Sequence, residues 1–432
     1  MPELALPPAA RTPPPPASTQ ETRQVPAAWL ALLATPVAAS ANGPVLILPD
    51  MADSLGVRTA TATWLVTVFA WAMAVGTPLM AGLLRRRGLD GTLRLSAVLI
   101  VAGTAVVAVA PWLPLAMAGR AAQAAGGAGL ITAAMSLAGS VRRMGVITAG
   151  FGTLGAAGPL LGSAIADVAS WRVSLAVGAV ALLALPAVLR RATPSAPRQR
   201  APGSGQSASE GGQSTPGGGR GTPFDGRGAA LLVLVATALV LVPRYPLPAV
   251  AASSALAALL ALHIRSRPTG FVPASLLRTR TFVLSALLAC ALATSYFTLL
   301  FTVPQLLGDR TGWSTSTIGT GQLVALLAGS ALSMVLAAAS ARMSRPRVLT
   351  ILLTAGALAP LTAVLTPWAP LLLLVATLAV LATSAGQATL AVYATQAAPT
   401  ALRPTAIGLF NLCYQLGGAF GPAIAALITL GG

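Results

Sequence analysis

Long apolar runs separated by short polar segments make up most of this chain of 432 residues. A helix needs about 20 apolar residues to cross a bilayer, and this criterion predicts thirteen membrane-spanning helices. Their expected ranges are 27–48, 62–84, 93–110, 113–138, 144–168, 172–189, 228–243, 247–264, 281–303, 318–340, 348–366, 369–393 and 405–430. The pattern predicts an all-α polytopic membrane protein in a lipid bilayer.

Two polar segments divide this series of apolar runs. Residues 1–26 include four consecutive prolines and no apolar run, which predicts a disordered cytoplasmic tail. Residues 191–227 are rich in Gly, Pro, Ser and Arg, which predicts a flexible cytoplasmic linker. We therefore expect an N-terminal six-helix bundle at 27–190, an inserted helix pair at 228–264 and a C-terminal bundle of five helices at 281–430.

The basic residues indicate the orientation in the membrane. All 27 are arginines, against 9 acids, so the formal net charge is +18. With a cytoplasmic N-terminus, 22 arginines fall in cytoplasmic segments, four fall outside, and Arg120 lies within a span. This asymmetry predicts a multi-pass protein of the cell membrane with its N-terminus in the cytoplasm. The arginines form short clusters and no continuous face, so no nucleic-acid partner is expected.

Composition excludes several kinds of chemistry. The chain is 55% apolar and 8% charged, which excludes a water-soluble domain. It has no lysine and one histidine, His263, so a P-loop lysine, a Schiff base and an HExxH zinc site are all excluded. Cys290 and Cys413 lie in apolar runs, where a thiol behaves as a small hydrophobic group. We expect no enzyme activity, no cofactor, no metal and no disulfide, and a monomer that binds a small-molecule substrate.

Arg120 is the strongest candidate for a functional residue. A guanidinium in hydrocarbon is costly unless it faces the bundle interior and finds acceptors. Gln123, three residues later, lies on the same side of the helix and could share a polar cavity with it. The alternative is that Arg120 lies near the outer end of its span and extends to the interface.

A series of glycines marks the fifth span. Gly155, Gly158 and Gly162 follow Gly152 at helical spacing, so they line one face and allow another helix to approach closely. Pro159 removes one backbone hydrogen bond within this series. Simple helix packing accounts for the glycines, whereas the Gly-Pro pair indicates a hinge or a permeability seal.

These motifs resemble those of the major facilitator superfamily. Arg120 with Gln123, Gly126 and Gly129 resembles its fourth-helix motif, and Gly155 with Gly158, Pro159 and Gly162 resembles the fifth-helix antiporter motif of its exporters. Trp171-Arg172 after Asp167, the inserted pair and FVPASLLRTRTF at 271–282 resemble the drug:proton antiporters with fourteen spans. The resemblance covers most of the chain and implies a two-bundle fold, alternating access, export and proton coupling.

The acidic residues depart from that family's pattern. Ser40 stands where the family usually has an acid in the first helix, and Arg85 stands where its loop motif has Asp. Only Asp167 could lie in a membrane helix, near the outer end, as a proton acceptor or as helix-end polarity. A cation exporter normally needs a carboxylate within the membrane. A neutral, anionic or zwitterionic substrate is therefore expected, with Arg120 as an anion contact.

Milder polar residues complete the candidate site. Asn411 and Gln415 are four residues apart and face one way, and Gln387 and Tyr393 do so less closely; Asn42 lies in the first span. Such groups either line a cavity for an amphipathic ligand or form hydrogen bonds between helices.

The second half repeats the first. The Gly417, Gly418 and Gly421-Pro422 series repeats the character of the fifth span, but the equivalent of the sixth span would begin beyond Gly432. We expect either a truncated sequence or a bundle that works without this helix.

The leading hypothesis is a secondary transporter that exports a small apolar, neutral or anionic compound. A proton-independent facilitator or importer, and a degenerate membrane protein without transport activity, are the alternatives.

Overall fold

The computed structural model describes residues 25–138, 141–192, 225–340, 342–366, 368–399 and 402–429. Every regular element in these ranges is a helix, which confirms the predicted fold class. The predicted tail at 1–26 and linker at 191–227 fall almost entirely outside the described residues, so both stay predictions.

The first half contains six crossings. Its elements are α1 (Ala27–Ala34), α2 (Pro36–Asn42), the 3-10 helix η1 (Gly43–Val45), α3 (Leu48–Leu55), α4 (Thr59–Ala62), α5 (Trp64–Val109), α6 (Leu113–Ala138), α7 (Val141–Val168), α8 (Trp171–Ser174), the 3-10 helix η2 (Leu175–Ala184) and α9 (Leu185–Ala192). The first crossing is made of short pieces, and the sixth is α8, η2 and α9 in series.

The second half contains five crossings and follows an inserted pair. The pair is α10 (Gly226–Val240) and α11 (Pro246–Ser266), and the second half comprises α12 (Ala274–Arg278), α13 (Arg280–Thr311), α14 (Thr315–Ser340), α15 (Arg345–Leu365), α16 (Ala369–Gln396) and α17 (Arg403–Thr429).

Among the described residues, length and composition give 10 helices able to cross a membrane, or 11 with the bent pair Ala27–Val45 and Leu48–Leu55, which meet at 72°. Length and composition alone miss two further crossings, one in α5 and one in α10. The 46-residue α5 contains a break at Gly88, whose φ of 70° favours glycine, so the helix folds back as two spans. The 15-residue α10 falls short of the length threshold. The arrangement agrees with the predicted thirteen.

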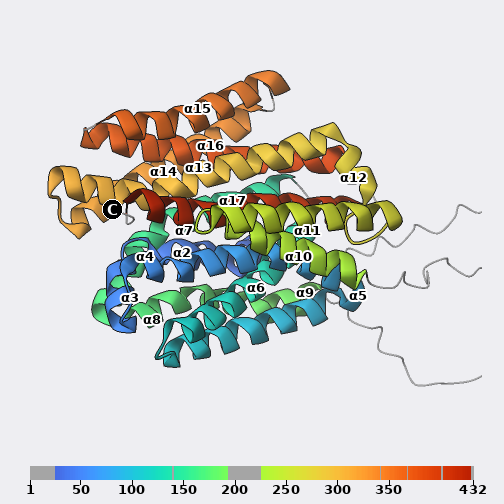
Figure 1. Cartoon of the computed structure of the whole chain (residues 1–432), viewed down its shortest axis with the longest axis horizontal. Helices are drawn as coiled ribbons and strands as arrows, with labels where there is room; N and C mark the ends of the chain where they lie inside the picture. The colour runs from blue at the N-terminus through green and yellow to red at the C-terminus, as the bar shows by residue number, and fades with distance from the viewer. Residues whose placement is uncertain are drawn as a thin grey trace, which may run out of the picture.

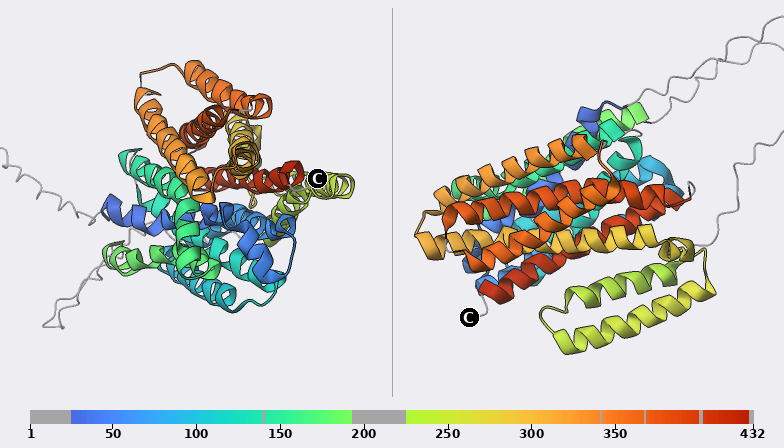
Figure 2. Two further views of the ribbon diagram at one scale, coloured as in Figure 1. Left: turned by 90° about the vertical axis from the view of Figure 1, so that its left-hand side faces the viewer. Right: turned by 90° about the horizontal axis from the view of Figure 1, so that it is seen from above.

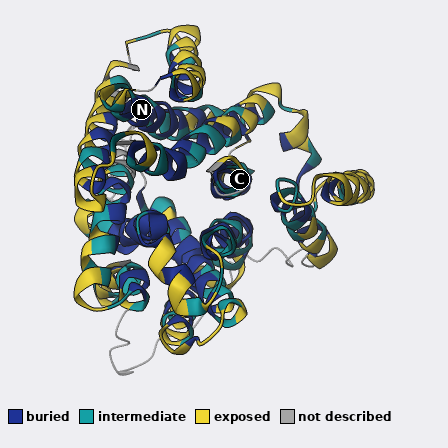
Figure 3. Ribbon diagram, turned by 60° about the vertical axis from the view of Figure 1, so that its left-hand side comes forward, coloured by how far each residue is buried: buried dark blue, intermediate teal, exposed yellow. Residues whose placement is uncertain are grey.

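The two halves lie side by side, with α1 to α9 on one side and α13 to α16 on the other (Figure 1). Helix α17 packs against α13 and also against α5 of the first half, and α14 packs against α7. Figure 2 shows the α10–α11 pair at the edge of the molecule, where α10 contacts α5 and α17 while α11 packs on α10. The outward faces of the helices are exposed and apolar, as expected for contact with lipid (Figure 3).

Glycines allow the same close packing in both halves. A Cβ at Gly162 of α7 would lie 2.3 Å from the carbonyl oxygen of Gly43, so α7 needs glycine to reach the first crossing. In the second half, a Cβ at Gly417 of α17 would lie 2.3 Å from the carbonyl oxygen of Cys290 in α13. The fifth crossing of each half thus packs on the first, and the close helix approach that the glycine spacing predicted occurs in both halves.

Candidate functional site

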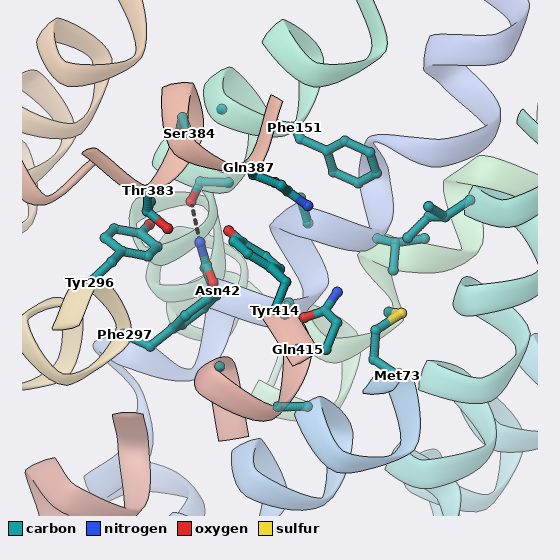
Figure 4. A pocket seen from close by; sticks show the side chains of 18 of the residues that line it. Asn42, Met73, Phe151, Tyr296, Phe297, Thr383, Ser384, Gln387, Tyr414 and Gln415 are labelled. Carbon is teal, nitrogen blue, oxygen red and sulfur yellow. Dashed lines mark hydrogen bonds between the residues drawn. The ribbon is translucent and has the colours of Figure 1, made fainter. Parts of the chain in front are cut away.

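A cavity of about 130 Å³ lies between the two halves. Helices α2, α5, α6 and α7 line it from the first half, and α13, α14, α16 and α17 line it from the second. Any relative movement of the halves would therefore change its shape and its access. In Figure 4, side chains from several of these helices point into one space.

Uncharged polar groups lie on the cavity wall. Four of the residues that the sequence predicted line it, namely Asn42, Gln387, Asn411 and Gln415. Figure 4 shows Asn42, Gln387 and Gln415 around the ring of Tyr414. The Asn42 amide nitrogen donates to the Gly155 carbonyl oxygen at 2.9 Å, which ties α2 to α7.

Apolar and aromatic side chains cover the rest of the wall. They include Phe69 and Met73 of α5, Ile131 and Met135 of α6, and Phe151 of α7. A wall of this kind, with a few polar groups to orient a ligand, is typical of sites for small amphipathic molecules.

The cavity wall carries no carboxylate. The acids within the described ranges all lie outside its lining, namely Asp50, Asp53, Asp90, Asp167, Asp225 and Asp309. A cationic group in this cavity would therefore lack an anionic partner, and its desolvation would not be compensated.

Arg120 lies behind the cavity wall in a buried network of neutral groups. Its side chain is fully buried. Arg120 Nη1 donates to Ser40 Oγ at 3.2 Å and to Gln123 Oε1 at 3.0 Å. Arg120 Nη2 donates to the Ser40 carbonyl oxygen at 3.1 Å. Gln123 Nε2 in turn donates to Thr104 Oγ1 at 3.0 Å and to the Leu175 carbonyl oxygen at 3.4 Å. Gln123, expected on the same side of the helix as Arg120, thus accepts a hydrogen bond from it directly.

The charge of Arg120 has no carboxylate partner among the described residues, whose two ion pairs are Arg94–Asp90 and His263–Asp225. The ring of Phe69 compensates part of it, since the guanidinium carbon lies 4.1 Å from the ring centroid. The positive charge therefore lies one aromatic ring away from the cavity that Phe69 also lines.

Two predicted candidates lie away from the cavity. Tyr393 is beyond its lining and packs its ring 4.9 Å from the guanidinium carbon of Arg345, near the end of α16. Asp167 is exposed, one residue before the end of α7. The structure thus groups four of the polar candidates in the cavity and Arg120 with Gln123 beside it.

The glycine motif of α7 contributes to both the packing and the cavity. Gly155 lines the cavity. A Cβ at Gly158 would lie 2.9 Å from the Ala39 carbonyl oxygen, so this residue and Gly162 hold α7 against the first crossing. The helix continues through Pro159.

Sequence reasoning missed the aromatic part of the site. Phe69, Tyr296 and Phe297 line the cavity, and the rings of Tyr296 and Phe297 meet edge to face with centroids 4.8 Å apart. An aromatic residue inside a long apolar run gives no signal that separates a cavity wall from a lipid-facing surface. The one available clue is the adjacent aromatic pair in α13, which places at least one ring toward the interior.

Comparisons with known proteins agree with this architecture. The sequence model of the Major Facilitator Superfamily matches residues 28–422. The fold is similar to the human organic anion transporter MFSD10 (TETRAN), with a TM-score of 0.59 and 19% identity over 97% of this chain and 95% of that chain. It is also similar to an auto-inhibited POT family peptide transporter, with a TM-score of 0.51 and 15% identity over 92% and 89% of the two chains. A search of curated protein sequences finds no match.

Proposed function

The chain belongs to the major facilitator superfamily, and from this premise we propose that it is a secondary transporter that exports a small, largely apolar, neutral or anionic compound by alternating access. The substrate would bind in the cavity between the halves and leave when the halves rock to open the opposite side. The protein would act as a monomer in the cell membrane, with its N-terminus in the cytoplasm.

The observation that carries the proposal is the chemistry of the cavity wall. Amides and hydroxyls such as Asn42, Gln387 and Gln415 donate to and accept from uncharged polar groups. The apolar part of the wall favours transfer of an apolar body from water or lipid. With no carboxylate in the lining, a neutral ligand loses the least on entry, and a cation loses the most.

Export and proton coupling rest on the motif of Gly155, Gly158, Pro159 and Gly162 in α7, which resembles that of antiporters. This motif lies where the first half packs on itself beside the cavity. A change in its packing would therefore be coupled to the shape of the substrate site.

Everted membrane vesicles from cells with and without the protein test the proposal. A panel of labelled neutral, anionic and cationic amphipathic compounds is added with a proton gradient present. We expect gradient-dependent accumulation of one or more neutral or anionic compounds, and none of the cations. If no compound accumulates and dissipating the gradient changes nothing, the exporter hypothesis is lost.

A matched pair of variants connects transport to the cavity. Gln415→Leu removes an amide from the cavity wall and should lower the apparent affinity for the accumulated compound several-fold, the effect of about one hydrogen bond. Gln396→Leu removes an amide from α16 outside the lining, where it accepts from Arg345 at 3.4 Å, and should leave the affinity unchanged. Equal effects of the two changes would contradict the assignment of the cavity as the substrate site.

A proton-independent facilitator is the second candidate, favoured by the absence of carboxylates from the cavity lining. Counterflow in vesicles without a pH gradient distinguishes the two. A facilitator exchanges labelled for unlabelled compound at the same rate whether or not a gradient is imposed, whereas an antiporter responds to the gradient.

A further inference from the structure

Phe69 of α5 lies between two spaces. It lines the central cavity and also a second, much smaller space of about 10 Å³ bounded by Ser40, Thr104 and Gln123. The small space adjoins the hydrogen-bond partners of Arg120 and has room for about one water molecule. Phe69 itself is 3% exposed, so its ring fills the position between them.

The guanidinium carbon of Arg120 lies over the ring of Phe69. The 4.1 Å separation between the guanidinium carbon and the ring centroid is a close cation–π contact. Arg120 is absent from the cavity lining although Phe69 belongs to it. A ligand in the cavity therefore meets the aromatic ring and not the cation.

Arg120 nevertheless retains donors suited to a carboxylate. A guanidinium carries five N–H groups, and the three hydrogen bonds to Ser40 and Gln123 use two on Nη1 and one on Nη2. The buried Nε makes no hydrogen bond within the described residues. Nε and Nη2 thus each keep one N–H that these bonds do not use, and a guanidinium with unused N–H groups can donate to a carboxylate.

We propose that Phe69 is a specificity-determining residue that screens Arg120 from the central cavity, so that the cavity selects uncharged, hydrogen-bonding molecules over carboxylates. This inference rests on the proposed function and narrows its substrate class. While the ring is in place, a carboxylate in the cavity loses its hydration and gains no contact with the cation. A neutral amphipathic molecule needs only the amides and hydroxyls of the wall.

Removal of the ring should reverse this selectivity. Phe69→Ala leaves a gap the size of a benzene ring between the cavity and the Arg120 guanidinium. Benzoate fits such a gap with its ring in place of the lost side chain and its carboxylate toward the guanidinium. Benzamide has the same shape without the charge, so the two form a matched pair of probes.

The experiment measures the apparent unfolding midpoint of the purified full chain in detergent against increasing benzoate or benzamide. A ligand that binds only the folded state raises the midpoint in proportion to its affinity. For Phe69→Ala we expect about tenfold tighter binding of benzoate than of benzamide, the preference that a charge-assisted hydrogen-bond pair provides. For the unmodified chain we expect tighter binding of benzamide, because benzoate loses its hydration there and gains no contact with the cation.

Phe151→Ala is the control variant. Phe151 also lines the cavity, but on α7 and without a stacked arginine, so its removal opens a similar gap with no cation behind it. Phe69 stays in place in this variant, so it should bind benzamide more tightly than benzoate, as the unmodified chain does. A preference for benzoate in Phe151→Ala, or equal binding in Phe69→Ala, overturns the proposal.

A second variant covers the case in which Phe69→Ala does not fold. Phe69→Val leaves a smaller gap and is tested with formate against formamide. Equal binding of these two probes again overturns the proposal. Because these measurements use no transport, a failure here leaves the transporter proposal intact. Conversely, a failure to find transport leaves the screening role of Phe69 measurable.

Discussion

The side chain of Arg120 is a buried cation surrounded by neutral partners. Its guanidinium is fully buried and donates to oxygens of Ser40 and Gln123, and its central carbon lies over the ring of Phe69. A desolvated charge without a counter-charge is destabilising unless hydrogen bonds and polarisable groups compensate. A carboxylate added next to the Arg120 guanidinium should therefore stabilise the folded protein.

Ser40→Asp should supply that carboxylate. Ser40 Oγ lies 3.2 Å from Arg120 Nη1, so an aspartate there would form a charge-assisted hydrogen bond with a cation that is already buried. Asp loses the bond that Ser40 Oγ donates to the Leu175 carbonyl oxygen at 3.1 Å, but a charge-assisted bond is worth more than this neutral one. We expect the free energy of unfolding to rise by about 1 kcal/mol, seen as a higher unfolding midpoint in detergent. Ser40→Asn has nearly the same shape without the charge and should not raise it. A midpoint that falls in the Asp variant alone would contradict the view of Arg120 as an uncompensated cation.

Among single residues, the sequence identified the buried charge but not the aromatic side chain that contacts it. The rarity of a charge inside an apolar span identified Arg120, and helical spacing identified Gln123, which the structure joins to it at 3.0 Å. Phe69 could not be identified in this way, because the sequence of an apolar run does not show which residues an aromatic side chain within it contacts. Its importance comes from a contact between residues 51 positions apart in the chain.

The inserted helix pair is held at one end by a cluster around a single carboxylate. Asp225 precedes α10 and accepts from the backbone N–H groups of Gly228 and Phe271, each at 2.9 Å. His263, near the end of α11, places Nε2 2.8 Å from Asp225 Oδ1. One side chain thus joins the start of α10, the end of α11 and the segment that leads into α12.

The stability that this cluster provides should depend on pH. Burial alone would raise the pKa of Asp225, but the N–H groups of Phe271 and Gly228, together with His263, outweigh it and hold the pKa below its usual value. A lowered pKa contributes stability above the ordinary pKa of about 4, and this contribution is lost as the pH falls further. We expect Asp225→Asn to lower the unfolding midpoint at neutral pH, and the difference from the unmodified chain to shrink below about pH 4.

Asp90→Asn is the matched control for that measurement. Asp90 pairs with Arg94 on the surface at 3.1 Å, with side chains 47% and 73% exposed, so its loss should change the free energy of unfolding by less than about 1 kcal/mol. A difference between Asp225→Asn and the unmodified chain that stays constant down to pH 3 would show that the charge of Asp225 does not contribute.

The apolar pattern predicted where the helices lie, but not where they are broken or change to 3-10 geometry. The range 113–138 coincides with α6. The first span, predicted as one helix over 27–48, is instead divided into α1, α2 and η1, because Pro36 and Pro44 each interrupt the backbone hydrogen bonding. Hydropathy counts apolar residues and is insensitive to such breaks, just as it could not predict the 3-10 geometry of η2.

The whole molecule consists of two halves that meet along two seams, α5 with α17 and α7 with α14. The cavity lies between these seams and is lined from both halves. Transport by alternating access requires the seams to open on one side while they close on the other. Fixing one seam should therefore stop transport without disturbing either half.

A disulfide between α7 and α14 tests this requirement. A Cβ at Gly152 would lie 3.3 Å from the Ser330 Cβ, close to the spacing of a disulfide. In a chain with Cys290→Ala and Cys413→Ala, we expect Gly152→Cys with Ser330→Cys to lose vesicle transport on oxidation and to recover it on reduction. Transport that persists in the oxidised protein would contradict the rocking of the two halves.

A second disulfide within one half is the control. A Cβ at Gly150 would lie 3.4 Å from the Thr35 Cβ, and both residues belong to the first half. Gly150→Cys with Thr35→Cys, in the same background, should form the bond with equal ease. It should leave transport unaffected by oxidation, because no seam between the halves is fixed.

The 3-10 helix in the sixth crossing also sets a length. Ten residues in η2 extend about 20 Å, whereas ten residues of α-helix extend about 15 Å. The extra 5 Å or so allows a short segment to match the thickness of the bilayer. It also carries Arg190 and Arg191 outward, where the Arg191 guanidinium lies 5.7 Å from the ring centroid of Trp29. Rewinding η2 as α-helix would draw both charges toward hydrocarbon, so the winding of this segment and the depth of the protein in its membrane are linked.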